Sequence, residues 1–225
     1  MRTLTKEMQD NITPALALEL LRRGNHRFVN NLKLHRNLLE QVNETKSGQH
    51  PFAVILSCMD SRTSAELIFD QGLGDIFSIR IAGNILNEDI VGSMEFACKV
   101  AGAKIILVLG HTKCGAVKGA CDGVKLGNLT PLLRKIEPAI INTSVTSFEV
   151  SNSYAFVDAV ATNNVHFVMD ELAQASPILS EMVHDGSIAI VGGMYNIETG
   201  KVDLFEHEHI SHLELSKEEL SALIA

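Results

Sequence analysis

Three residues of metal-binding type lie in two short polar segments of the chain. Cys58 belongs to the first segment, and His111 and Cys114 stand three positions apart in the second. Zinc prefers thiolate and imidazole ligands in tetrahedral geometry, and a site with three protein ligands leaves the fourth position to water. That open arrangement is typical of catalytic zinc sites. The pattern therefore predicts one catalytic Zn²⁺ ion on Cys58, His111 and Cys114.

A carboxylate and a guanidinium follow the first cysteine. Asp60 comes two positions after Cys58, and Arg62 comes four positions after it. Asp60 can accept a hydrogen bond from the attacking oxygen and orient it, or it can become a fourth ligand that closes the site. Arg62 can hold the carboxylate bidentately and away from the metal. At about 4 Å and an effective dielectric constant of about 20, the raw attraction is roughly 4 kcal/mol, which is enough to bias this choice.

Apolar runs of strand length occur four times along the chain. They are Phe52–Leu56, Ile76–Ile79, Lys104–Leu109 and Ile188–Val191. Continuous apolar runs are typical of strands that are covered on both faces, as in parallel sheets. Cys58 follows the first run and His111 follows the third. Since ligands of open parallel sheets bind beyond the carboxyl ends of the strands, we expect the two polar segments to meet there.

Helical patterns separate the apolar runs. They are Ser64–Phe69, Asp89–Val100, Ala116–Cys121 and Tyr154–Ala175. Strands that alternate with helices predict an α/β fold, with a central, mainly parallel β-sheet flanked by helices. The alternation of polar and apolar residues over Lys201–Phe205 predicts a further edge strand.

An amphipathic helical arm is expected before the first strand. Thr13 and Pro14 are a typical N-cap and first helical residue. Gly24 interrupts the apolar stripe that follows, so we expect a weak point in the helix there. The length predicts a single domain, with the helical arm over 1–45 and an α/β core over 46–225. The pattern leaves open whether the arm packs on its own core or on a partner subunit.

The composition excludes several classes of partner. A formal net charge of −8 opposes binding to nucleic acid or to an anionic membrane, because both attract basic surfaces. The chain has no apolar run long enough to cross a bilayer. Residues 1–10 lack the apolar stretch of a secretory signal, so we expect a cytoplasmic protein. In that reducing compartment the four cysteines are thiols or metal ligands rather than disulfides.

Several motifs resemble the β-class carbonic anhydrases in their order and spacing. They are GNHRFVNN (24–31), CMDSR (58–62), GDIFSIRIAGN (74–84) and GSMEFACKVAGAKIILVLGHTKCGAVKG (92–119). The resemblance implies zinc on Cys58, His111 and Cys114, with Asp60 and Arg62 as the catalytic dyad. It also implies a homodimer, often doubled to a homotetramer, whose small-molecule substrates are carbon dioxide and bicarbonate.

The family has two kinds of site, and the resemblance implies the open kind here. In the open kind a glutamine and aromatic side chains line the substrate pocket. Gln49, Phe77 and Phe96 stand at the matching positions, with Phe96 in place of a commoner tyrosine. In the closed kind Asp60 would be a further zinc ligand, and a tryptophan would stand three residues before the first cysteine. That position is Ile55, and the chain has no tryptophan.

The sequence therefore predicts reversible hydration of carbon dioxide to bicarbonate and a proton. Water beside two thiolates and one imidazole is less acidic than beside three neutral histidines, where its pKa is about 7, so we expect activity to rise into the mildly alkaline range. Two alternatives stay open: a hydrolase of carbonyl sulfide or carbon disulfide on the same scaffold, and a non-catalytic bicarbonate-binding zinc protein. Pocket size would decide the first. The presence of both Asp60 and Arg62 speaks against the second, because a structural site needs no such dyad.

The other cysteines and the histidine-rich tract near the C-terminus are interpreted as structural or surface residues that do not bind the metal. Cys98 lies in a predicted helix and is expected in the core. Cys121 follows Cys114 by seven residues, about 10 Å along a helix, which is too far to share one ion. The tract Glu206–His212 is expected to be a solvated strand or a surface helix. His50 stays a hypothesis for a proton shuttle at the pocket mouth.

Overall fold

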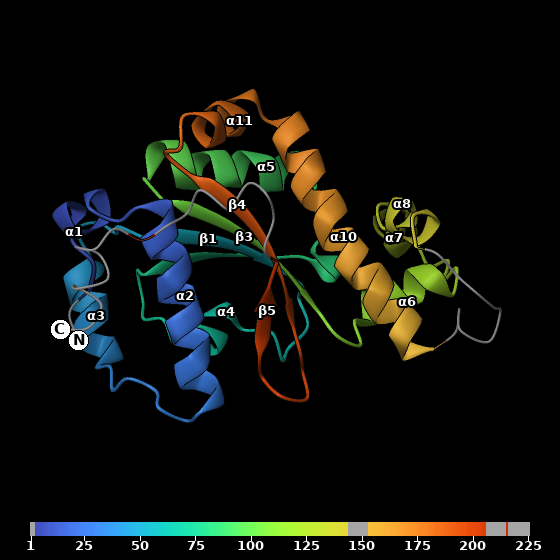
Figure 1. The fold of residues 1–225 in the computed structure, drawn as a ribbon, viewed down its shortest axis with the longest axis horizontal. Helices are drawn as coiled ribbons and strands as arrows, with labels where there is room; N and C mark the ends of the chain where they lie inside the picture. Colours follow the sequence, from blue (N-terminus) through green and yellow to red (C-terminus); the bar gives the residue numbers. More distant parts are fainter. Residues whose placement is uncertain (1–2, 144–152, 206–214, 216–225) are drawn as a thin grey trace.

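A five-stranded sheet forms the centre of the protein (Figure 1). The computed structural model describes residues 3–143, 153–205 and 215, and within them the strand order is β2-β1-β3-β4-β5. The strands are β1 (Ala53–Ser57), β2 (Ile76–Arg80), β3 (Ile105–His111), β4 (Ala189–Tyr195) and β5 (Val202–Leu204). The first four are parallel to their neighbours, and β5 is antiparallel to β4. The predicted α/β fold with a mainly parallel sheet is confirmed.

The strands coincide with the apolar runs of the sequence. Every residue of the central strands β1 and β3 is buried, which is why neither shows polar alternation. The edge strand β5 lies within Lys201–Phe205, as predicted. β3 continues to His111 and β4 to Tyr195, beyond the predicted ends at Leu109 and Val191, because the two strands stay paired over that length.

Helices cover both faces of the sheet (Figure 1). Those that pack on it are α2 (Pro14–Val29), α4 (Ala65–Ile68), α5 (Glu88–Glu95), α10 (Tyr154–Ala175) and α11 (Pro177–His184). α2 and α4 cover one face, where Leu21 shares a core with Ile55. α5, α10 and α11 cover the other face, where Val165 shares a core with Val108.

A third group of helices packs beside the first half of α10. These are α6 (Gly115–Cys121), α7 (Leu129–Arg134) and α8 (Glu137–Ile141). Their shared core also contains Cys58 and Cys114, which places two of the predicted ligands among apolar side chains. The remaining elements are α1 (Lys6–Asp10), α3 (Leu38–Thr45), the 3₁₀ turn η1 (Ala82–Asn84) and the π-helical turn η2 (Phe96–Val100). None of the described helices is both long enough and apolar enough to cross a membrane.

The helix α2 begins as expected and is continuous at Gly24. Thr13 caps it by accepting a hydrogen bond from the amide of Leu16 at 3.1 Å, and Pro14 is its first residue. The helix then continues through Gly24 to Val29. Gly24 causes no break in the helix, and the expected weak point there stays a prediction.

Gly24 instead allows two helices to approach closely. A Cβ atom at this position would lie 1.8 Å from the carbonyl oxygen of Phe69, the residue that ends α4. No side chain fits at that distance, so the absent side chain is what lets α2 reach α4. The buried face of α2, which includes Leu18 and Leu21, packs on the core of its own chain.

Gly24→Ala is expected to lower the free energy of unfolding by about 2 kcal/mol, because the added methyl group overpacks this contact. The same replacement normally stabilises a helix, by about 1 kcal/mol. Gly119→Ala in α6 is the matched control, since its Cβ would lie at an ordinary 3.5 Å from the nearest atom, Leu133 Cδ1. Urea unfolding followed by circular dichroism measures both variants. Equal effects at the two positions would contradict the packing role of Gly24.

Candidate metal centre

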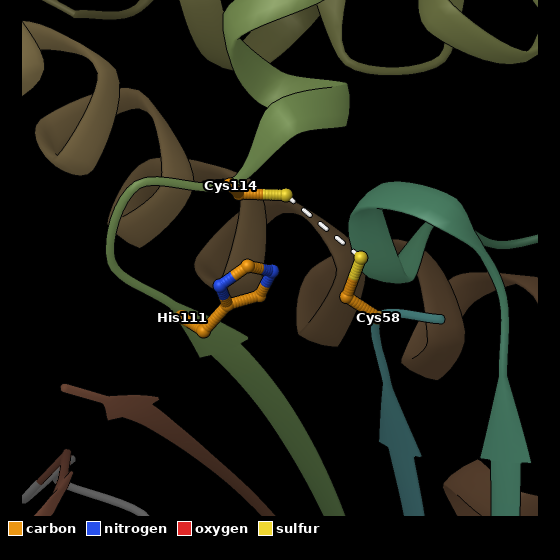
Figure 2. Close-up of side chains that lie close together, drawn as sticks. All are labelled: Cys58, His111 and Cys114. Atoms are coloured by element: carbon orange, nitrogen blue, oxygen red, sulfur yellow. Dashed lines mark hydrogen bonds between the residues drawn. The ribbon is translucent and has the colours of Figure 1, made fainter. Parts of the chain in front are cut away.

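The three predicted ligands converge at the carboxyl end of the sheet (Figure 2). Cys58 directly follows β1, His111 is the last residue of β3, and Cys114 directly precedes α6. β1 and β3 are neighbouring parallel strands, so their carboxyl ends lie side by side. The two polar segments therefore meet where the strand pattern predicted.

The distances between the ligand atoms fit a tetrahedral zinc ion. One ligand atom from each residue lies within 4.8 Å of the others, and the sulfurs of Cys58 and Cys114 are 3.9 Å apart. Two thiolates at the usual Zn–S distance and tetrahedral angle are separated by about 3.8 Å. All three side chains are buried. Within the described ranges, this is the one group of histidine, cysteine and acidic side chains with such spacing.

The hydrogen bonding of His111 leaves one ring nitrogen for a metal. Nδ1 lies 2.9 Å from the backbone carbonyl oxygen of Thr112. A carbonyl oxygen can only accept, so Nδ1 carries the proton and Nε2 keeps its lone pair. Nε2 is buried and has no hydrogen-bond partner among the described residues. A buried nitrogen without a partner is unfavourable, and ligation of a metal accounts for it.

The two cysteines form a coupled pair. The thiol of Cys114 donates to the sulfur of Cys58, which lowers the pKa of Cys58 to about 4 although burial opposes the change. The same interaction, together with burial, raises the pKa of Cys114. The amide of Gly83 also donates to the Cys58 sulfur, at 3.4 Å. The hydrogen bond therefore favours the thiolate form of Cys58 and the thiol form of Cys114. A thiolate and a second thiol that can ionise are the ligand set that zinc requires.

Asp60 and Arg62 form a bidentate ion pair next to the ligands. Arg62 donates from Nε to Asp60 Oδ1 at 2.9 Å and from Nη2 to Oδ2 at 2.7 Å, and its backbone amide also reaches Oδ1 at 2.9 Å. These bonds hold the pKa of Asp60 well below its usual range, so the carboxylate is ionised. Asp60 does not belong to the group of close ligand atoms formed by Cys58, His111 and Cys114.

Comparison with known proteins decides the family. The sequence model of the carbonic anhydrases matches residues 53–202, a range that contains all three ligands and the Asp60–Arg62 pair. The chain belongs to the carbonic anhydrase family.

Individual carbonic anhydrases agree with this assignment. The chain is 34% identical over 203 residues to carbonic anhydrase 2 of Mycobacterium tuberculosis, which covers 88% of this chain and 95% of that protein. It is 33% identical to the carbonic anhydrase of Mycolicibacterium smegmatis, with 88% and 96% covered. Among solved structures, the β-carbonic anhydrase CcaA gives a TM-score of 0.65 at 27% identity, with 84% and 95% covered. The resemblance to the β class is confirmed.

The three predicted pocket residues of this carbonic anhydrase do not lie beside the predicted metal ligands of their own chain. Phe77 in β2 and Phe96 in η2 pack edge to face, with ring centroids 6.4 Å apart. They line a surface pocket together with Val54 and Ser93, and none of the three ligands borders it. Gln49 is exposed in the segment that precedes β1.

The length of β1 separates Gln49 from the metal centre. Pro51 lies at the amino end of the strand, where its carbonyl oxygen accepts from Gln9 Nε2 at 2.7 Å, and Cys58 lies at the carboxyl end. Seven residues of nearly extended chain span about 20 Å. Two residues can return at most about 7 Å. Gln49 therefore cannot contact the metal ligands of its own chain.

Arg80 and Thr63, which the sequence pattern did not single out, support the loop after β1 that carries Cys58. Arg80, the last residue of β2, donates from Nε to the carbonyl oxygen of Cys58 at 3.3 Å and from Nη2 to that of Asp60. The hydroxyl of Thr63 lies 2.9 and 2.8 Å from the same two oxygens. The register that sets Arg80 opposite Ser57 is the signal for its role. That register requires the order of the strands, which the sequence pattern does not give.

The other two cysteines stay outside the metal centre. Cys98 is buried in the core under α5 and α10, as predicted, and burial raises its pKa to about 12. Cys121 ends α6 and does not belong to the group of close ligand atoms. The tract Glu206–His212 lies outside the described residues.

Zinc binding near pH 7 is expected to release about one proton per chain, from Cys114, because the hydrogen bond from Cys114 favours the thiolate form of Cys58. Since the raised pKa of Cys114 makes its proton compete with the metal, the apparent affinity should rise about tenfold per pH unit around neutrality. Calorimetric titration in two buffers of different ionisation enthalpy counts the protons. Cys98→Ala, in the core, should leave the count unchanged. Release of two protons would contradict the Cys58 thiolate.

Proposed function

We propose that the protein reversibly hydrates carbon dioxide to bicarbonate and a proton, with a zinc ion held by Cys58, His111 and Cys114. The observation that carries the proposal is the group of three buried ligand atoms within 4.8 Å of one another. Membership of the carbonic anhydrase family supports the reaction, which is that of a lyase. Two sulfurs and one imidazole nitrogen favour zinc over magnesium or calcium, which prefer oxygen ligands.

Asp60 orients the attacking oxygen in this proposal. When bound, zinc supplies a nucleophile at moderate pH by lowering the pKa of water. Asp60 is ionised because Arg62 lowers its pKa, so its oxygens accept hydrogen bonds and do not donate them. Oδ1 takes two hydrogen bonds from Arg62 and Oδ2 takes one. A carboxylate oxygen has two lone pairs, so Oδ2 keeps one for the hydrogen of the nucleophile.

Arg62 keeps Asp60 away from the metal in this proposal. If Asp60 became a ligand, the bidentate pair would have to break, and such charge-assisted pairs are among the stronger hydrogen bonds of proteins. The Arg62 side chain is 51% exposed, whereas that of Asp60 is 17% exposed. The pair thus stands where the buried centre meets solvent, and the proton of the reaction passes to buffer there.

The substrate pocket forms between two copies of the chain in this proposal. Gln49, Phe77 and Phe96 stand at the pocket positions of the family but away from the ligands of their own chain. Phe96 is 54% exposed and packs beside Phe77 on β2, an edge strand of the sheet. A symmetric homodimer would bring these residues to the metal centre of the partner. Pairing of two dimers would give the homotetramer.

The proposed compartment is the cytoplasm. Zinc binding needs the sulfurs of Cys58 and Cys114 in reduced form, although they lie only 3.9 Å apart. All four cysteines of the chain are unpaired. A reducing compartment prevents the oxidation of such a pair.

Isotope exchange between labelled bicarbonate and water tests the reaction. Protein of measured zinc content is expected to catalyse exchange, increasingly so from about pH 6.5 to about pH 9. Asp60→Asn should keep its zinc but lose about 100-fold in turnover, because the amide has neither the charge nor the acceptor geometry that orient the nucleophile. The matched control is Asp122→Asn, an exposed acid paired with Lys118 on α6, which should keep both properties.

Absence of exchange at full zinc loading at every pH would remove the proposed reaction and leave its alternatives. Full turnover of Asp60→Asn would remove the orienting role alone.

Mixing two inactive variants tests the shared pocket. Gln49→Ala removes the side-chain amide from the proposed pocket, and Cys58→Ala removes a proposed metal ligand. Each homodimer is therefore expected to be nearly inactive. In an equal mixture, half of the dimers pair one subunit of each kind, and each such dimer has one intact site. The mixture is therefore expected to recover about a quarter of wild-type exchange after subunits reassort. No recovery, with mixed dimers verified by mass spectrometry, would contradict the shared pocket.

A further inference from the structure

Two polar residues of α10 contact the two segments that hold the metal ligands. α10 packs on β3 and β4 and is the longest helix of the described ranges (Figure 1). Its Asn164 bonds to the turn η1, which contacts Cys58, and its Asp158 bonds to the loop between His111 and Cys114. Both residues lie outside the motifs that mark the ligands and the Asp60–Arg62 pair.

Asn164 acts on Cys58 through Gly83. Its Nδ2 donates to the carbonyl oxygen of Gly83 at 3.0 Å, and the amide of Gly83 donates to the Cys58 sulfur at 3.4 Å. Gly83 has a φ of +68°, which favours glycine, and a Cβ there would lie 2.7 Å from Ile136 Cδ1. The backbone at Gly83 is thus held in one conformation between the side chains of Asn164 and Cys58. Asn164 fixes where the N–H group of Gly83 meets the sulfur.

The side chain of Asn164 is unfavourable for folding alone. It is 0% exposed, and its Oδ1 has no hydrogen-bond partner among the described residues. A buried amide with an unpaired oxygen destabilises a core relative to an apolar side chain of similar size. Polar residues that break a folding rule in this way are expected at functional sites. The hydrogen bond to Gly83 explains why an asparagine occupies this buried position.

Asp158 holds the second ligand segment. Its Oδ1 accepts a hydrogen bond from the backbone amide of Lys113 at 2.6 Å. Lys113 has a φ of +53°, a left-handed conformation that residues other than glycine seldom adopt. Because Lys113 lies between His111 and Cys114, its conformation sets the distance between these two ligands. The hydrogen bond to Asp158 stabilises that strained turn.

We propose that Asn164 and Asp158 are positioning residues of the zinc centre, which hold Cys58 on one side and the His111–Cys114 loop on the other. One helix then fixes the separation of ligands that come from two different strands. Partners of this kind orient ligands and tune the metal, and their loss typically costs about 10- to 100-fold in metal affinity. The inference rests on the proposed zinc centre and adds two residues to it.

Replacement of Asn164 by leucine tests the first contact. Asn164→Leu removes the donor at nearly constant volume, so zinc transfer to a chelator is expected to be about 10- to 100-fold faster. Cobalt(II) in place of zinc gives a second readout, because its thiolate charge-transfer band reports the sulfur–metal bonds, and this band should shift. Asn163→Leu is the matched control, since the Nδ2 of Asn163 donates to Thr143 Oγ1 at 2.7 Å instead. Both readouts of the control should equal those of the wild type.

A pair of replacements at the half-buried Asp158 tests the second contact. Asp158→Ala removes the acceptor and should speed zinc release, whereas Asp158→Asn keeps an acceptor oxygen and should restore most of the wild-type rate. Val168→Ala, a core change in α10, measures the effect of lost packing alone. Circular dichroism of the zinc-free variants monitors their folding. If the core variant Asn164→Leu does not fold, the two Asp158 variants still test the inference.

The outcomes separate the inference from the proposed function. Wild-type protein that takes up no stoichiometric zinc or cobalt would overturn the zinc centre itself. Wild-type binding together with variants of Asn164 and Asp158 that behave like Asn163→Leu would overturn the positioning role alone. That role would also be overturned if Val168→Ala released zinc as fast as Asn164→Leu and shifted the cobalt band equally, because lost packing would then suffice.

Discussion

The side-by-side ending of β1 and β3 is the constraint on which the metal centre depends. In their parallel register Ser57 lies opposite Leu109, so Cys58 leaves β1 close to the point where His111 ends β3. Both strands are buried along their whole length, which fixes them between the helices of the two faces. A register slip of one residue would move the cysteine by about 3 Å, more than a metal–ligand bond can absorb.

Two negatively charged groups, the Cys58 thiolate and the Asp60 carboxylate, lie at this end of the sheet, and each is stabilised by different partners. The Cys58 thiolate is stabilised in a buried position by the Cys114 thiol and by the amide of Gly83. Asp60 is stabilised by Arg62 at the rim, where solvent reaches the pair. The soft sulfur ligands are thus available for a metal while the hard carboxylate is engaged elsewhere. Under the proposed mechanism, this division keeps one coordination position open to water.

The predicted pocket residues and the predicted metal ligands occupy different parts of the fold in one chain. The aromatic pair Phe77 and Phe96 lies at the edge of the sheet, and Gln49 lies before β1, whereas the ligands lie beyond the opposite end of that strand. The side chain of Phe96 is 54% exposed. The proposed dimer would account for its exposure and for the separation together.

The sequence by itself determined the three candidate metal ligands, the Asp60–Arg62 pair as neighbours, and the apolar strands, because ligand chemistry and burial leave local patterns. It did not reveal why Gly24 is a glycine, since that depends on the crossing of α2 with α4. It held no sign of Arg80 or Asn164 either. Their partners are backbone groups of distant segments, and only the strand order and the path of α10 bring those groups within reach. Residue type can be read from the sequence, whereas contact between a side chain and a remote backbone group arises only from packing.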